Sequence, residues 1–183
     1  IKAMSPKMDR IQEKLVIKDA IQTPTDIYQF MIKEMNKYGK LTIDVNGEKS
    51  FKYNNPDMHV FCIVDTLNAL NADPGLEKFG SMRRWSENYC KMGLSMVYNL
   101  ITVTVQQLDD KGRSGQFTNT GQKIEEKHEP SQGNLADVKS TPGDNTIVMS
   151  LFSPSKYGIS SYMGYDTKRM GDHYIKLGII KNN

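Results

Sequence analysis

Two short apolar runs, separated by a segment with helical periodicity, constrain the fold of this chain most strongly. The first run covers residues 60–64 ("VFCIV") and the second covers residues 100–105 ("LITVTV"). Between them, apolar residues recur at intervals of three or four over residues 81–99, which is typical of an amphipathic helix. Strand, helix and strand in this order favour an α/β fold with a largely parallel sheet.

Three further segments extend this alternation. Residues 14–20 ("KLVIKDA") predict a short strand, residues 146–152 ("TIVMSLF") a buried strand, and residues 174–180 ("YIKLGII") a last strand. The helix over residues 81–99 carries one apolar stripe that we expect to pack in the core. Its members are Met82, Trp85, Tyr89, Met92 and Met96.

The residues "TPTD" predict the start of another helix, which runs from Pro24 to about residue 38. Thr23 is suited to the N-cap and Pro24 to the first helical position. Asp26 completes a capping box and lies where negative charge is favoured. Gly39 is expected to end this helix.

A β-hairpin insertion is predicted over residues 40–54. Apolar and polar residues alternate on both sides of Asn46-Gly47, and this dipeptide between alternating runs is a strong hairpin signal. The charged outward face predicts a hairpin on the surface.

Length and composition favour one soluble domain over residues 1–183. The chain has a mass of 20.8 kDa, 38% hydrophobic and 25% charged residues. Cys62 and Cys90 have no metal-ligand spacing and are expected to be reduced core residues of a cytoplasmic protein. No apolar run is long enough for a membrane span, so no membrane partner is expected. A net charge of +3 allows a nucleic-acid partner without favouring one.

Polar residues follow two of the predicted strands. Asp65 follows residues 60–64, and Gln106 and Gln107 follow residues 100–105. In parallel sheets, ligands bind beyond the carboxyl ends of strands. Asp65 is therefore either a Walker B carboxylate, which holds magnesium-bound water beside a nucleotide, or the N-cap of the next turn. Gln106 either senses a γ-phosphate or simply begins a loop.

Other catalytic motifs are missing from the sequence. Residues 75–81 ("GLEKFGS") have the glycine spacing of a P-loop, but Ser81 stands where the lysine is needed. We interpret this segment as a loop into a helix. His59, His128 and His173 lack ligand spacing, and no catalytic triad is evident.

A long polar segment covers residues 108–145 and lacks apolar periodicity. Segments of this length inside a domain are usually functional or mobile. Its basic residues, including Lys111, Arg113 and Lys139, are interspersed with glutamates. DNA contact requires that this loop face a pore or groove.

The order of these segments resembles the later part of the RecA-type ATPase core, and most closely the phage-type DnaB-like replicative helicases. The likeness runs from about residue 14 to residue 183. It is carried by "KLVIKDAIQTPTDIYQFM", "RRWSENYC", "GQFTNTGQKIEEKHEPS" and "LFSPSKYGISSYMGYDTKRMGDHY". The resemblance implies an α/β, RecA-like three-layer core that is incomplete on its N-terminal side, with the hairpin as an addition.

The resemblance also implies roles for individual residues. Asp65 resembles the Walker B aspartate, which binds ATP and Mg²⁺. Gln106 resembles the sensor glutamine, with Gln107 as the alternative. Lys181 resembles a lysine that reaches the nucleotide of a neighbouring subunit. Within the segment 108–145, residues 137–143 resemble a DNA-contacting pore loop, so Lys139 is the first candidate for a phosphate contact with single-stranded DNA, together with Lys111 and Arg113.

Three departures from the family pattern accompany these roles. The Walker A lysine and the catalytic glutamate belong to a region upstream of Ile1, so we do not expect this chain to hydrolyse ATP alone. Asn183 stands where the family usually has an arginine finger. Residues 144–146 ("DNT") replace the usual Asp-Ala-Asp.

The resemblance leaves three functions to consider. The first is part of the ATPase motor of a phage-encoded hexameric helicase in the bacterial cytoplasm. The second is a degenerate, non-catalytic RecA-like subunit of a phage assembly. The third is a recombinase of the same fold.

Overall fold

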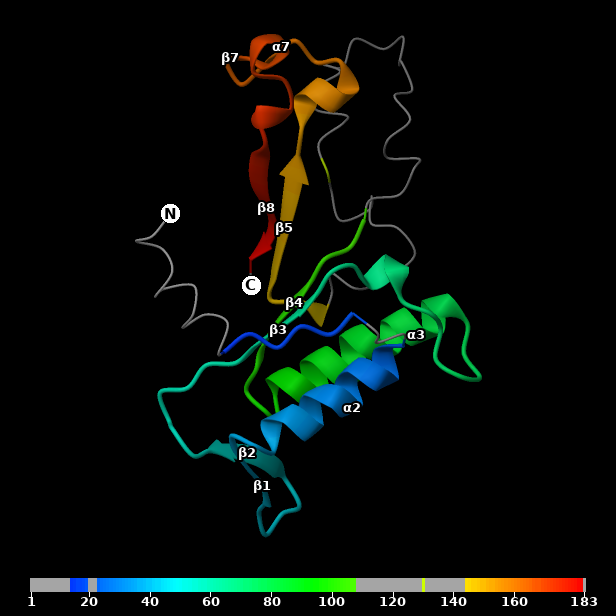
Figure 1. Ribbon diagram of the computed structural model, residues 1–183, viewed down its shortest axis with the longest axis vertical. Helices are drawn as coiled ribbons and strands as arrows, with labels where there is room; N and C mark the ends of the chain where they lie inside the picture. Colours follow the sequence, from blue (N-terminus) through cyan, green and yellow to red (C-terminus); the bar gives the residue numbers. More distant parts are fainter. Residues whose placement is uncertain (1–13, 20–22, 108–129, 131–143, 183) are drawn as a thin grey trace.

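The computed structural model describes residues 14–19, 23–107, 130 and 144–182 (Figure 1). Its first part contains α2 (Pro24–Met35), β1 (Gly39–Ile43), β2 (Lys49–Tyr53), β3 (Phe61–Val64), η1 (Leu67–Ala69), α3 (Lys78–Arg84), η2 (Trp85–Ser95) and β4 (Ile101–Thr104). The second part contains β5 (Ile147–Phe152), η4 (Pro154–Tyr157), β6 (Ser161–Tyr162), β7 (Tyr165–Asp166), α7 (Thr167–Met170), η5 (Gly171–His173) and β8 (Lys176–Asn182).

The described strands pair into four two-stranded sheets rather than one largely parallel sheet. β3 and β4 are parallel, as expected for strands joined through helices. β1 and β2, β5 and β8, and β6 and β7 are antiparallel. The prediction of a largely parallel sheet is therefore wrong for these residues. The short elements between β5 and β8 reverse the chain direction, so that β8 runs antiparallel beside β5.

The predicted strand over residues 14–20 does not form in its described part, residues 14–19. Leu15, Val16 and Ile17 are exposed. None of the four sheets places a strand beside them, so their backbone has no ladder to join.

The capping box of α2 is confirmed. The Asp26 N–H donates to Thr23 Oγ1 at 3.2 Å, and the Thr23 N–H donates to Asp26 Oδ2 at 3.1 Å. The helix ends at Met35, earlier than predicted, and a turn follows. Gly39 instead begins β1. A Cβ atom there would overlap the Lys52 carbonyl oxygen on β2, so this glycine serves strand pairing.

The surface hairpin is also confirmed, with Gly39 opposite Tyr53 and Ile43 opposite Lys49. Gly47 adopts a φ of 84°, which glycine tolerates without strain. Asp44 closes the turn, because its Oδ1 accepts the N–H groups of Asn46 and Glu48 at 2.8 Å each.

The second predicted helix changes its winding partway. It starts as α3 and continues as the π-helix η2, in which the Met96 N–H reaches back five residues to the Lys91 carbonyl at 3.1 Å. Met82 and Trp85 are buried as predicted, but Met92 and Met96 are 55% and 65% exposed.

Tyr89 still packs against the core, and the wider turn of η2 explains why the predicted stripe fails after it. A π-helix needs more residues per turn than an α-helix, so the step of three from Tyr89 to Met92 moves off the buried face. The buried residues that follow Trp85 are instead Cys90, Leu94 and Tyr98.

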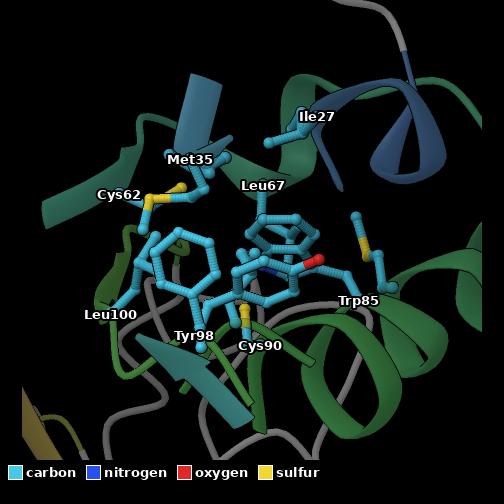
Figure 2. Packing of buried hydrophobic residues seen from close by; sticks show 12 residues of the cluster. Ile27, Met35, Cys62, Leu67, Trp85, Cys90, Tyr98 and Leu100 are labelled. Carbon is cyan, nitrogen blue, oxygen red and sulfur yellow. The ribbon is translucent and has the colours of Figure 1, made fainter. Parts of the chain in front are cut away.

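The main core lies between the helices and one face of the β3–β4 pair (Figure 2). Trp85 is at its centre, and its Nε1–H donates to Thr104 Oγ1 on β4 at 3.1 Å. Tyr28 of α2 stacks on Tyr89 of η2 with ring centroids 4.4 Å apart. These contacts tie both helices to the strand pair. A smaller cluster at the far end of β5 contains Phe152, Ile159 and Tyr162.

Strands β3 and β5 were expected to be buried, but each is buried or partly buried on one face only. Phe61 and Ile63 are 58% and 66% exposed, while Cys62 and Val64 are buried. Along β5, Met149 and Leu151 are likewise exposed. Among the described residues, the β3–β4 and β5–β8 pairs each therefore present an exposed apolar face.

We predict that Gly93→Ala destabilises the fold. A Cβ at Gly93 would lie 2.7 Å from Tyr28 Cε2, and the Tyr28 ring is held by its stack on Tyr89. We expect a loss of about 1–2 kcal/mol in the free energy of unfolding, measured by urea denaturation with circular dichroism. Gly80→Ala is the matched control. Its Cβ meets its nearest neighbour at 3.9 Å, so it should stabilise α3 by up to about 1 kcal/mol. Equal stabilities for the two variants would contradict this packing.

We predict that Cys62 and Cys90 are unreactive in the folded protein. Both thiols are free and buried, and burial raises the pKa of Cys62 to about 11 and of Cys90 to about 12. Because the folded state retains thiol protons that the unfolded state releases, stability should fall as the pH rises above about 8.5. Slow labelling by a thiol reagent at pH 8, becoming fast in urea, is the expected result. Labelling at the unfolded rate without urea would argue against it.

Candidate functional site at the ends of β3 and β4

The parallel pairing of β3 with β4 brings the predicted site residues to one edge. Phe61 pairs with Ile101, and Val64 pairs with Thr104. Asp65 directly follows β3, and Gln106 and Gln107 follow β4. The carboxyl ends of the two strands therefore coincide, as the sequence predicts for a ligand-binding edge.

Three hydrogen bonds continue the pairing beyond the last strand residues. The Val105 N–H donates to the Val64 carbonyl at 2.9 Å, and the Leu67 N–H donates to the Val105 carbonyl at 2.9 Å. The Gln107 N–H donates to Asn68 Oδ1 at 2.8 Å. Backbone on both sides of the candidate site is thereby held together.

Asp65 is exposed in this structure, so the burial penalty expected for its carboxylate does not arise. Its side chain forms no hydrogen bond or ion pair with another described residue. The N-cap of the following turn η1 is Thr66, not Asp65. The capping alternative is therefore wrong, and the Asp65 carboxylate stays accessible to a ligand.

The strand register separates the two glutamines. Phe61 and Ile63 lie on the uncovered face of β3, and alternation places Asp65 on that face too. Their β4 partners Ile101 and Val103 share this face.

The alternation on β4 continues past the strand end. The Ile101, Val105 and Gln107 N–H groups all donate toward the β3 side. Gln107 therefore lies on the face of Asp65, whereas Gln106 lies on the face of Thr104 and is less exposed. Of the two glutamines, the register favours Gln107 as the neighbour of Asp65.

Lys181 lies on β8, where it pairs with Val148. Its Nζ donates to the carbonyl oxygen of Asn145 at 2.8 Å, so here it contacts its own chain. Lys111, Arg113, Lys139 and Asn183 lie outside the described residues.

Two further residues make side-chain contacts between segments that are far apart in the sequence. Asn68 is the first, through its bond to Gln107. The second is Asp144, which precedes β5 and joins it to η2. Its Oδ2 accepts from Ser86 Oγ at 3.0 Å, and Lys91 Nζ lies 4.0 Å from its Oδ1. No local motif marks Asn68, and Asp144 stands out in the sequence only as the first residue of "DNT"; neither contact could be predicted from a local pattern.

The described residues contain no group of three or more histidine, cysteine or acidic side chains that could hold a metal ion. A magnesium ion at a nucleotide needs less, since one or two carboxylates, waters and phosphate oxygens complete its shell. The exposed carboxylate of Asp65 fits that requirement. Within the same described ranges, no helix combines the length and hydropathy of a membrane span.

Comparison with known proteins finds similarity at the level of structure. No family model matches the chain, and no curated protein matches it. A solved structure titled "The Structure Of A DnaB-Like Replicative Helicase And Its Interactions With Primase" matches with a TM-score of 0.60 and 16% sequence identity. The match covers 91% of this chain and 32% of that chain, so this chain spans about a third of its length. The chain thus has a mixed α/β fold similar to part of a DnaB-like replicative helicase.

Proposed function

We propose that this chain is part of the ATPase motor of a hexameric replicative DNA helicase, which couples ATP hydrolysis to translocation on single-stranded DNA. The observation that carries the proposal is the fold shared with a DnaB-like replicative helicase over 91% of the chain. The common edge of β3 and β4, with Asp65 and Gln107 on one face, supports it at the level of the site.

In this proposal the chain supplies one part of a RecA-like nucleotide site. A region outside this chain would provide the P-loop lysine and the catalytic glutamate. The uncovered apolar face of β3, with Phe61 and Ile63, supports a three-layer core in which further structure packs against that face.

The residues at the strand ends would have separate roles in binding and hydrolysing the nucleotide. Asp65 would hold Mg²⁺ through ordered water, and the ion would neutralise charge on the phosphate oxygens. A glutamine at the end of β4 would donate to the γ-phosphate or position the attacking water. Gln107 is favoured by the register, and Gln106 is the alternative. Lys181 would have to release the Asn145 carbonyl to reach a nucleotide on a neighbouring subunit.

We predict that Asp65→Ala in the full-length protein lowers kcat for ATP hydrolysis by about a hundredfold or more. The fold should be unaffected, because the Asp65 side chain is exposed and forms no hydrogen bond or ion pair with a described residue. Steady-state ATPase assays and urea denaturation measure the two properties. Asp57→Ala is the matched control, since Asp57 is also an exposed aspartate but precedes β3.

A near-normal kcat for ATP hydrolysis in Asp65→Ala would contradict the proposal that this chain is part of an ATPase motor. An absence of ATPase activity in the wild-type full-length protein would favour the non-catalytic subunit.

We predict that Lys139→Ala weakens binding of single-stranded DNA equally for different sequences. Removing one phosphate contact should lower the slope of log Kd against log salt concentration by about 0.7 to 1. Fluorescence anisotropy with labelled oligonucleotides at several salt concentrations measures this slope. Lys52→Ala, on the surface hairpin, is the control and should leave the slope unchanged. An unchanged slope in Lys139→Ala would remove this residue from the DNA interface.

A further inference from the structure

We propose that Asn68 is a positioning residue, which holds Gln107 in the orientation needed beside Asp65. This inference rests on the proposed function, because it concerns the same nucleotide site. It follows from a side-chain contact that links the segment after β3 to the segment after β4. Asn68 Oδ1 accepts the Gln107 N–H at 2.8 Å, across a sequence separation of 39 residues.

The contact extends the β3–β4 ladder beyond its last backbone pair. The Ile101 N–H donates to the Val60 carbonyl, and the Val105 N–H donates to the Val64 carbonyl. Gln107, three residues beyond the end of β4, is the next residue whose N–H points the same way. By then β3 has ended, and the side-chain oxygen of Asn68 takes the place of a strand carbonyl.

Asn68 is itself held on both sides, so it can act as a fixed acceptor. It lies in the single turn η1, which the Ala69 N–H closes on the Thr66 carbonyl at 3.1 Å. Lys78 Nζ donates to the Asn68 carbonyl at 2.7 Å, which connects the turn to the start of α3. Asp65 is three residues before Asn68 in the same segment. The segment after β3 therefore carries Asp65 and also holds the backbone of Gln107 through Asn68.

The consequence concerns the direction of the Gln107 side chain. Continued alternation from β4 places that side chain on the face of Asp65. Without an acceptor for its N–H, the backbone at this exposed position gains rotational freedom. The side-chain amide of Gln107 would then point toward the nucleotide only part of the time. Misplacement of a catalytic group by about 1 Å can lower a rate a hundredfold.

The experiment compares three single variants with the wild type. Asn68→Ala removes the acceptor, and Asn68→Asp keeps an oxygen at the same position. Asn71→Ala is the matched control, because Asn71 is an exposed asparagine in the same loop and its side chain forms no hydrogen bond with a described residue. The measurements are amide hydrogen exchange at Gln107 in this chain, and kcat and KM for ATP hydrolysis by the full-length protein.

We expect Asn68→Ala to speed exchange at Gln107 by about fivefold, as for the loss of one hydrogen bond, and to leave Leu67 and Val105 unchanged. In the full-length protein it should lower kcat by roughly tenfold to a hundredfold, with KM changed less than about threefold. Asn68→Asp should restore both properties, and Asn71→Ala should match the wild type.

Faster exchange with a wild-type kcat would reduce Asn68 to a purely structural role and overturn the inference. A lower kcat that Asn68→Asp does not restore would overturn it as well. Asp65→Ala, measured in parallel, separates this failure from that of the proposed function. If Asp65→Ala is inactive, only the role of Asn68 is lost. If Asp65→Ala turns over normally, the proposed function fails and the inference fails with it.

Discussion

The parallel pairing of β3 with β4 is the constraint on which the rest of this structure depends. Two parallel strands cannot be joined by a tight turn, so the chain between them must cross over, and it does so as α3 and η2. Those helices, with α2, cover one face of the pair and bury Trp85 against β4. The same pairing aligns the strand ends, so Asp65 and Gln107 follow strands that end at one edge although they are far apart in the sequence.

Local signals in the sequence were enough to predict several elements. The capping box at Thr23 and Asp26, and the Asn46-Gly47 turn, depend on contacts within a few residues, and the structure confirms both. The positions of β3 and β4 also follow from their apolar runs. Burial was harder to predict, because an apolar run such as that of β3 is the same in sequence whether one or both faces of the strand are covered.

Other features depend on contacts that no local pattern contains. A spacing of three or four residues predicts an α-helix, and on that basis Met92 was expected in the core. Because η2 has wider turns, Met92 is exposed to solvent in the structure. The antiparallel return of β8 along β5 depends on the compact turns between them. Asn68 and the choice between Gln106 and Gln107 become visible only through the strand register.

The bond from Trp85 to Thr104 gives the chain a built-in optical probe. Trp85 is the single tryptophan, and its indole N–H contacts β4 two residues before Gln106. A change at the end of β4 would alter this hydrogen bond and the polarity around the indole, and hence its emission wavelength. Events at the strand ends can therefore be followed by fluorescence in the unlabelled protein.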